Sequence, residues 1–200
     1  FSATASLPDG SSTQILFSCY LMICGLKMFM DEKHVMILGV GCILFADEGF
    51  GVRVIEKLQE QYEVPDNVSV VDGGVLGVNL LGVISQADQL IVVDAIRNKG
   101  NPGDMYRLSD KQIPERIRAK NSIHQVDFLE ALTLCQALDK VPDTVIVGVE
   151  PEDIDSLSIE LTPVIQSKVA SMIQMVLTEL DRLEVPYYQR KRNHVSRNPI

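Results

Sequence analysis

Three carboxylates and one histidine have the residue types and positions to carry chemistry. Glu48 follows the first predicted β-strand, Asp72 ends the second, Asp94 ends the third, and His124 lies where a loop meets a helix. Because the carboxyl ends of parallel strands open onto one crevice, side chains distant in sequence can gather there. Two carboxylates with one imidazole suit zinc, nickel, iron or manganese, and the same groups can polarise a water molecule. The pattern indicates a metal or hydrolytic site.

Each of these residues also has a purely structural interpretation. Asp47 and Glu48 lie in or beside a first helical turn, where the helix dipole favours a carboxylate without a catalytic role. Asp72 precedes two glycines, which is a common turn signature. At Asp94 function and a buried hydrogen bond are equally supported, because a carboxylate ending a central strand is costly to bury unless paired or bound. A lone histidine such as His124 is more often structural or solvated.

Several familiar catalytic and binding motifs are missing from the chain. The loop after the first strand carries Gly39 and Gly41 but has Leu44 where a dinucleotide-binding GxGxxG needs its third glycine. The sequence contains no GxxxxGK[ST], GxSxG or HExxH. A nucleotide-binding enzyme, a serine hydrolase and a zincin-type protease are therefore unsupported.

The elements that must position these side chains alternate between strands and helices. Val52, Ile55, Leu58 and Tyr62 recur at helical spacing, 75–86 form a weaker helical stretch, and another helix follows His124. Thr162 begins a last helix, whose apolar stripe runs to Leu183. Strands are predicted at 34–41, 67–74, 89–96 and 143–151, with a shorter strand within 103–110 that suits a sheet edge. Short connections and the right-handed crossover rule then predict an α/β fold: a single three-layer domain with a twisted, mostly parallel sheet of about five strands flanked by helices.

Composition limits the possible partners. The 200 residues are 46% hydrophobic, enough for one domain with a substantial core, and the formal net charge is −9. Nucleic acid and anionic membranes repel such a surface, so neither is an expected stable partner. The four cysteines show no CxxC spacing or disulfide-rich density, which is typical of a reducing cytoplasm.

The two ends of the sequence differ from its middle. Residues 1–33 contain a twelve-residue apolar run at 15–26, shorter than the roughly 20 residues of a bilayer span. We expect this leader to lie outside a fold that starts near Met28 or Met30, with an interfacial anchor as the second interpretation. The predicted domain spans 34–184, and 185–200 form a basic tail, solvated rather than a docking arm.

Five motifs in order, GVGCILFADEGFGVRV, VVDGG, IVVDAI, NSIHQ and VGVEPE, resemble those of the nickel-iron hydrogenase maturation endopeptidases. The resemblance runs from about Val35 to Leu183 and implies a twisted, mostly parallel sheet between helices. It also implies the activity: hydrolytic removal of a short C-terminal extension from the hydrogenase large-subunit precursor after nickel insertion. We expect a cytoplasmic monomer whose partner is that precursor.

The resemblance implies roles for individual residues. Glu48, Asp94 and His124 match the family's metal-binding glutamate, aspartate and histidine, and Asp72 matches the aspartate that lines the same cleft. The nickel would belong to the substrate, although another divalent metal can occupy the site in isolation. The chemistry would be a nickel-dependent, metal-assisted hydrolysis of the aspartic type, without a serine or cysteine nucleophile. Asp47 is left with a helix-dipole or loop-stabilising role.

One position departs from the family's pattern. Its loop usually reads GxGN, whereas Cys42 stands here in place of the asparagine and removes several hydrogen-bonding groups. A non-enzymatic nickel-checking or chaperone module for hydrogenase assembly, using the same three ligands, is the alternative function. A mass spectrum of the precursor after mixing separates the two, because only the endopeptidase shortens it.

Overall fold

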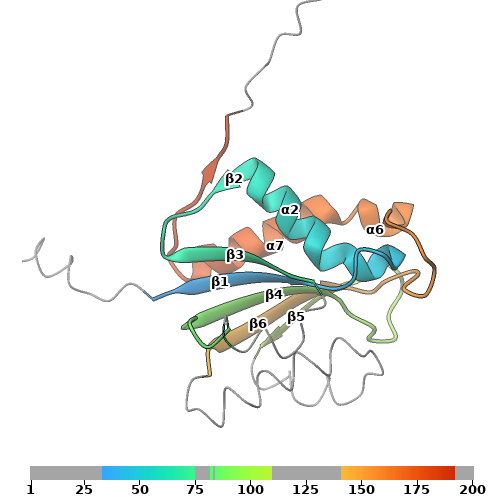
Figure 1. Ribbon diagram of the computed structural model, residues 1–200, viewed down its shortest axis with the longest axis horizontal. Coiled ribbons are helices and arrows are strands. Elements are labelled where there is room, and N and C mark those ends of the chain that lie inside the picture. The colour runs from blue at the N-terminus through green and yellow to red at the C-terminus, as the bar shows by residue number, and fades with distance from the viewer. Residues whose placement is uncertain (1–32, 75–81, 83, 110–140, 192–200) are drawn as a thin grey trace, which may run out of the picture. The chain divides into compact units, whose positions relative to one another are not determined.

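The computed structural model describes residues 33–74, 82, 84–109 and 141–191. A five-stranded sheet with the order β3-β1-β4-β6-β5 forms its centre (Figure 1). The strands are β1 (Val35–Val40), β3 (Val68–Gly74), β4 (Gln89–Ala95), β5 (Met105–Ser109) and β6 (Asp143–Val149). The predicted α/β class and the sheet of about five mostly parallel strands are confirmed.

The sheet is parallel except for its edge strand β5. Neighbours among β3, β1, β4 and β6 pair in parallel, and β1 is buried along its whole length, as expected of a strand covered on both faces. β5 is antiparallel to β6 and lies at the end of the sheet, so the predicted edge strand is also confirmed. The four parallel strands therefore present their carboxyl ends at one edge of the sheet.

Both faces of the sheet bury apolar side chains. Strand residues alternate between two clusters, since Ile37 belongs to the cluster that includes Phe50 and Ile165, whereas Leu38 belongs to a second one that includes Ile84. Figure 1 shows helices α2 and α7 together on one face of the sheet. The helical elements are η1 (Ala46–Gly49), α2 (Phe50–Gln61), α6 (Pro163–Gln166) and α7 (Val169–Arg182). The helix predicted within 75–86 and the one after His124 lie almost entirely outside the described residues.

The helix predicted from Thr162 to Leu183 is divided in two. The Lys168 N–H donates to the Ile165 carbonyl, only three residues back, so the chain tightens into a turn between α6 and α7. The predicted apolar stripe survives this break. Its members Ile165, Val169, Met172, Ile173, Val176 and Leu180 are all buried.

Residues 185–190 continue to pack on the domain. β7 (Tyr188–Gln189) pairs antiparallel with β2 (Tyr62–Glu63), and the Val185 side chain is buried in the core. The folded part therefore extends at least to Gln189, beyond the predicted boundary at 184. Two-residue strands carry no readable periodicity, which is why the sequence did not predict this pair. Among the described helices, none is long and apolar enough to cross a membrane.

Candidate active site

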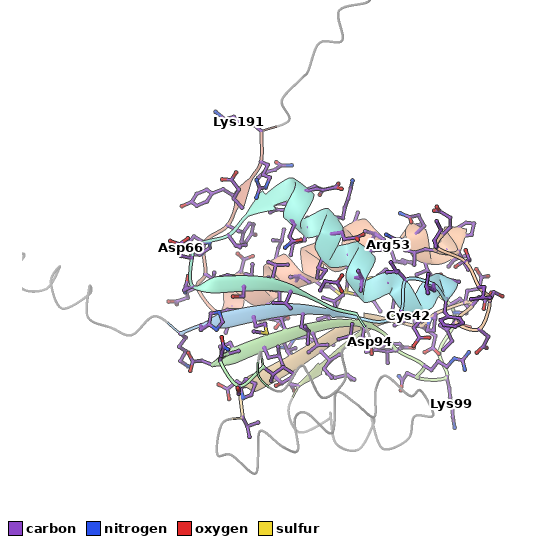
Figure 2. The ribbon with its side chains drawn as sticks, viewed as in Figure 1. Cys42, Arg53, Asp66, Asp94, Lys99 and Lys191 are labelled. Atoms are coloured by element: carbon purple, nitrogen blue, oxygen red, sulfur yellow. The ribbon has the colours of Figure 1, made fainter. Side chains whose placement is uncertain are left out.

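The strand register places two of the predicted site residues at the same edge of the sheet. Gly39 in β1 is aligned with Asp72 in β3 on one side and with Val93 in β4 on the other, so Asp94 lies one residue beyond this row. Figure 2 shows Asp94 at the end of the sheet where β1 enters its loop, the end at which Cys42 also lies. The topology thus brings together carboxylates that are 22 positions apart in sequence.

Close backbone packing fixes the loop that carries Glu48. Gly41 has φ +127°, and a Cβ on it would lie 1.8 Å from the Glu48 carbonyl oxygen, so only glycine fits. A Cβ on Gly51, in the first turn of α2, would lie 2.2 Å from the Val93 carbonyl oxygen. The Gly41 N–H also donates to the Gly74 carbonyl at 3.1 Å, which ties the loop to the end of β3. Glu48 is therefore held beside the ends of β1 and β4.

Asp47 holds a second loop against the first. Its side chain is fully buried, and Oδ2 accepts the backbone N–H groups of Glu152 and Asp153, each at 2.9 Å. Oδ1 accepts the Thr162 N–H at 2.7 Å, and the Thr162 hydroxyl donates to Oδ2 at 3.0 Å. Such bonds to a charged acceptor are strong and offset the cost of burying it. The loop-stabilising role predicted for Asp47 is confirmed.

The remaining predicted carboxylates stay accessible. Glu48 and Asp94 are half-buried and Asp72 is exposed. The Asp72 Oδ1 accepts the Gly74 N–H at 2.9 Å, which is the turn role that the sequence offered as its structural interpretation. The second oxygen of that carboxylate is not needed for the turn. This edge of the sheet therefore combines buried carboxylates that hold loops with accessible carboxylates that can meet a ligand.

The third expected metal ligand, His124, lies outside the described residues. Within the described ranges no group of three or more histidine, cysteine, aspartate or glutamate side chains is arranged to hold a metal ion. The complete ligand set of Glu48, Asp94 and His124 thus stays a prediction. Glu48 and Asp94 supply only oxygen ligands, the hard part of the set that the sequence predicts.

A second buried carboxylate, Glu150, was not among the predicted residues. It follows β6, and its Oε2 accepts the N–H groups of Asn98 at 2.7 Å and Gly100 at 3.1 Å and the Tyr106 hydroxyl at 2.8 Å. Burial, then the hydrogen bond to Glu150, raises the pKa of Tyr106 to about 12. Glu150 therefore holds the segment after Asp94 much as Asp47 holds the segment after β6. The sequence contained the same signal as at Asp94, an acid directly after a buried strand.

Cys42 takes part in the loop through its backbone. The Phe45 N–H donates to the Cys42 carbonyl at 3.2 Å, which closes a turn without any side chain. The thiol is free and half-buried. Replacement of the family's asparagine is thus compatible with this turn.

Comparison with known proteins identifies the same family that the motifs resemble. The model of the hydrogenase maturation protease family (HycI) matches residues 52–179. The hydrogenase expression/formation protein HupD of Bradyrhizobium diazoefficiens is 38% identical over 147 residues, which cover 72% of this chain and 77% of that protein. The hydrogenase 2 maturation protease of Escherichia coli is 36% identical over 163 residues, covering 80% of this chain and 99% of that protein.

The fold agrees with this relationship. The solved structure of the hydrogenase maturating endopeptidase HybD from E. coli superimposes with a TM-score of 0.75 at 36% identity and covers 78% of this chain and 98% of that one. Family model, sequence relatives and fold therefore coincide, and the chain belongs to the hydrogenase maturation proteases.

Proposed function

We propose that this protease removes the C-terminal extension of a nickel-iron hydrogenase large-subunit precursor once nickel has been inserted. The observation that carries the proposal is the strand register, which brings Asp94 to the edge where Gly41 and Gly51 pack the Glu48 loop against β1 and β4. Membership of the hydrogenase maturation proteases supplies the reaction class.

The nickel in this proposal is part of the substrate. Glu48, Asp94 and His124 ligate it at positions left open by the precursor, so that only a loaded precursor holds its scissile peptide in place. Positioning of this kind contributes much of the rate and the selectivity. The bound nickel then polarises the scissile carbonyl or a water molecule, and one carboxylate at this edge takes the proton from the water.

Two buried carboxylates, Asp47 and Glu150, are poorly placed to ligate the nickel or to accept the proton. Both are occupied by backbone N–H donors, and ligating a metal would require breaking those bonds. Glu48, Asp94 and Asp72 are accessible to different degrees, and Asp72 is the one to which the family resemblance gives a lining role rather than a ligand role. The proposed ligands are therefore the accessible members of a larger acidic set.

The test uses the full chain and a large-subunit precursor in two forms, nickel-loaded and nickel-free. Intact-mass spectrometry after mixing is expected to show loss of the extension from the loaded form only. Cleavage of both forms at the same rate would contradict the role of nickel in recognition. Binding of the loaded precursor without any loss of mass would contradict the enzymatic proposal and favour a nickel-checking module.

A further inference from the structure

Large hydrophobic side chains are exposed next to the Glu48 loop. Among the described residues, Leu44 is 54% exposed, Leu157 80% and Ile159 59%, and these three residues are called the apolar patch below. Ile43, beside them in sequence, is 38% exposed. Single exposed hydrophobic residues are normal on protein surfaces, but contiguous ones mark an interaction site.

The backbone joins the two segments that carry the apolar patch. Phe45 and Ser158 form an isolated parallel bridge, in which the Ser158 N–H donates to the Leu44 carbonyl at 3.0 Å and the Ala46 N–H donates to the Ser158 carbonyl at 2.7 Å. Leu44 and Leu157 directly precede the two bridged residues, and Ile159 directly follows Ser158. Ser158 is half-buried, whereas Leu44, Leu157 and Ile159 are all exposed.

The apolar patch is held in place from beneath. Besides the bonds to Asp47, the Arg53 guanidinium of α2 donates to the Ile159 carbonyl at 3.0 Å. The Asp153 carboxylate accepts the N–H groups of Asp155 and Ser156, both at 3.0 Å, and the bonds from these residues lower its pKa. A surface that is already ordered loses little conformational entropy when a partner binds. The exposure of these side chains therefore belongs to a fixed feature of the fold.

We propose that the apolar patch is the docking surface for an apolar stretch of the precursor polypeptide, close to the segment that is cleaved. This inference rests on the proposed function. Leu44 lies four residues before Glu48 in the sequence. A precursor whose nickel is bound by Glu48 therefore brings its polypeptide close to Leu44. The protease must bind the precursor polypeptide as well as its nickel. The apolar patch can bury apolar side chains of that polypeptide in the contact.

The occupant is a polypeptide with apolar side chains rather than an acidic ligand. The segment 150–160 carries five acidic groups and no basic one, and the net charge of −9 disfavours an acidic partner at this surface. A second copy of this chain would bring the same acidic segment against itself, which costs further free energy. The precursor is the partner that must approach this edge of the sheet in any case.

The experiment compares cleavage kinetics of the loaded precursor by the native protein and by Leu157→Ser, Ile159→Ser and the double variant. Each single substitution is expected to raise KM about tenfold and the double variant about a hundredfold, with kcat nearly unchanged, because an exposed contact binds ground state and transition state equally. Leu157→Met, which keeps the apolar volume, is expected to restore the native KM. The matched control is Val141→Ser, at a side chain 50% exposed and two residues before β6, for which KM should not change.

The outcomes separate this inference from the function on which it rests. Native kinetics in the double variant would overturn the docking surface while leaving the proposed cleavage intact. Failure of the native protein to cleave the loaded precursor would overturn both. Sedimentation that shows a native dimer and a monomeric double variant would assign the apolar patch to self-association and contradict the proposal.

Discussion

Asp47 and Glu48 are neighbours in sequence with the same charge, yet the structure uses them differently. Asp47 is fully buried and accepts four hydrogen bonds from Glu152, Asp153 and Thr162, whereas Glu48 is half-exposed. Both lie in η1, and successive side chains of a 3₁₀-helix point about 120° apart. One short turn thus buries one carboxylate completely and leaves the next half-exposed.

The same division recurs at the end of the neighbouring strands. Glu150, after β6, is buried and holds the segment that follows Asp94, while Asp94 itself is half-buried. Glu48 and Asp94 thus each lie next to a segment that a buried carboxylate holds. Residue type does not separate the buried carboxylates from the accessible ones, whereas the exposure of each side chain does.

The largest predicted effect is a loss of cleavage activity on substitution of the accessible carboxylates, Glu48 and Asp94. Glu48→Gln and Asp94→Asn are each expected to lower the cleavage rate of the loaded precursor about a thousandfold, because a neutral amide is a weak metal ligand. Their free energies of unfolding should stay within about 1 kcal/mol of the native value. Timed mass spectrometry and urea unfolding give the two quantities. Full activity in either variant would break the division between the classes.

Substitution of the buried carboxylate Asp47 is predicted to lower stability instead. Asp47→Ala leaves three backbone N–H groups and one hydroxyl without their acceptor, so we expect a loss of about 3 kcal/mol in the free energy of unfolding. Glu152→Ala, which removes an exposed carboxylate from the same loop, is the control and should change stability by no more than about 0.5 kcal/mol. Equal stability of the two variants in urea would refute the structural role of Asp47.

A smaller effect is predicted for substitution of Glu150, and it is measured as a change in the pKa of Tyr106. The pKa of Tyr106 is raised to about 12 by burial and by Glu150, so its contribution to stability is present below its ordinary pKa of 10 and is lost as the pH rises toward 12. Glu150→Gln should lower this pKa, since it removes the negative charge beside the phenol. Ultraviolet difference titration, with Tyr106→Phe to identify the signal, measures it. An unchanged pKa in Glu150→Gln would contradict the contact.

The smallest effect is expected at Cys42. Because the turn is closed by the Cys42 carbonyl and the Phe45 N–H, restoring the family residue with Cys42→Asn should change stability by less than about 0.5 kcal/mol. Cleavage should change by less than about threefold, as expected of a side chain that ligates nothing. A large gain in activity would show that the asparagine contacts the precursor.

Local patterns predicted much of this architecture. The buried strands, the edge strand and the acids at their ends follow from runs such as QLIVVDAI, in which apolar residues stop at a carboxylate. Hydrogen-bond partners far apart in sequence could not be predicted. A loop-stabilising role was expected for Asp47, but its donors lie 105 to 115 positions away. The break between α6 and α7 was missed because the apolar stripe continues through it.

The site itself was predictable to the extent that it depends on strand ends. Asp72 and Asp94 were identified from that rule and lie at one edge of the sheet, and Glu150 obeys the same rule but was overlooked. The exposure of Leu44, Leu157 and Ile159 could not be predicted, because the sequence does not tell whether a hydrophobic residue in a loop is buried or exposed. Only the backbone bridge at Ser158 makes them one feature.

In the proposed function, Glu48 binds the nickel carried by the substrate, whereas buried Asp47 and Glu150 stabilise the loops around it. The most direct measurement is the ratio of kcat/KM for loaded over nickel-free precursor in the native protein, in Glu48→Gln and in Glu152→Gln. We predict a ratio of about a thousand for the native protein and for Glu152→Gln, and a ratio near one for Glu48→Gln. A native ratio near one, or an undiminished ratio in Glu48→Gln, would contradict the claim.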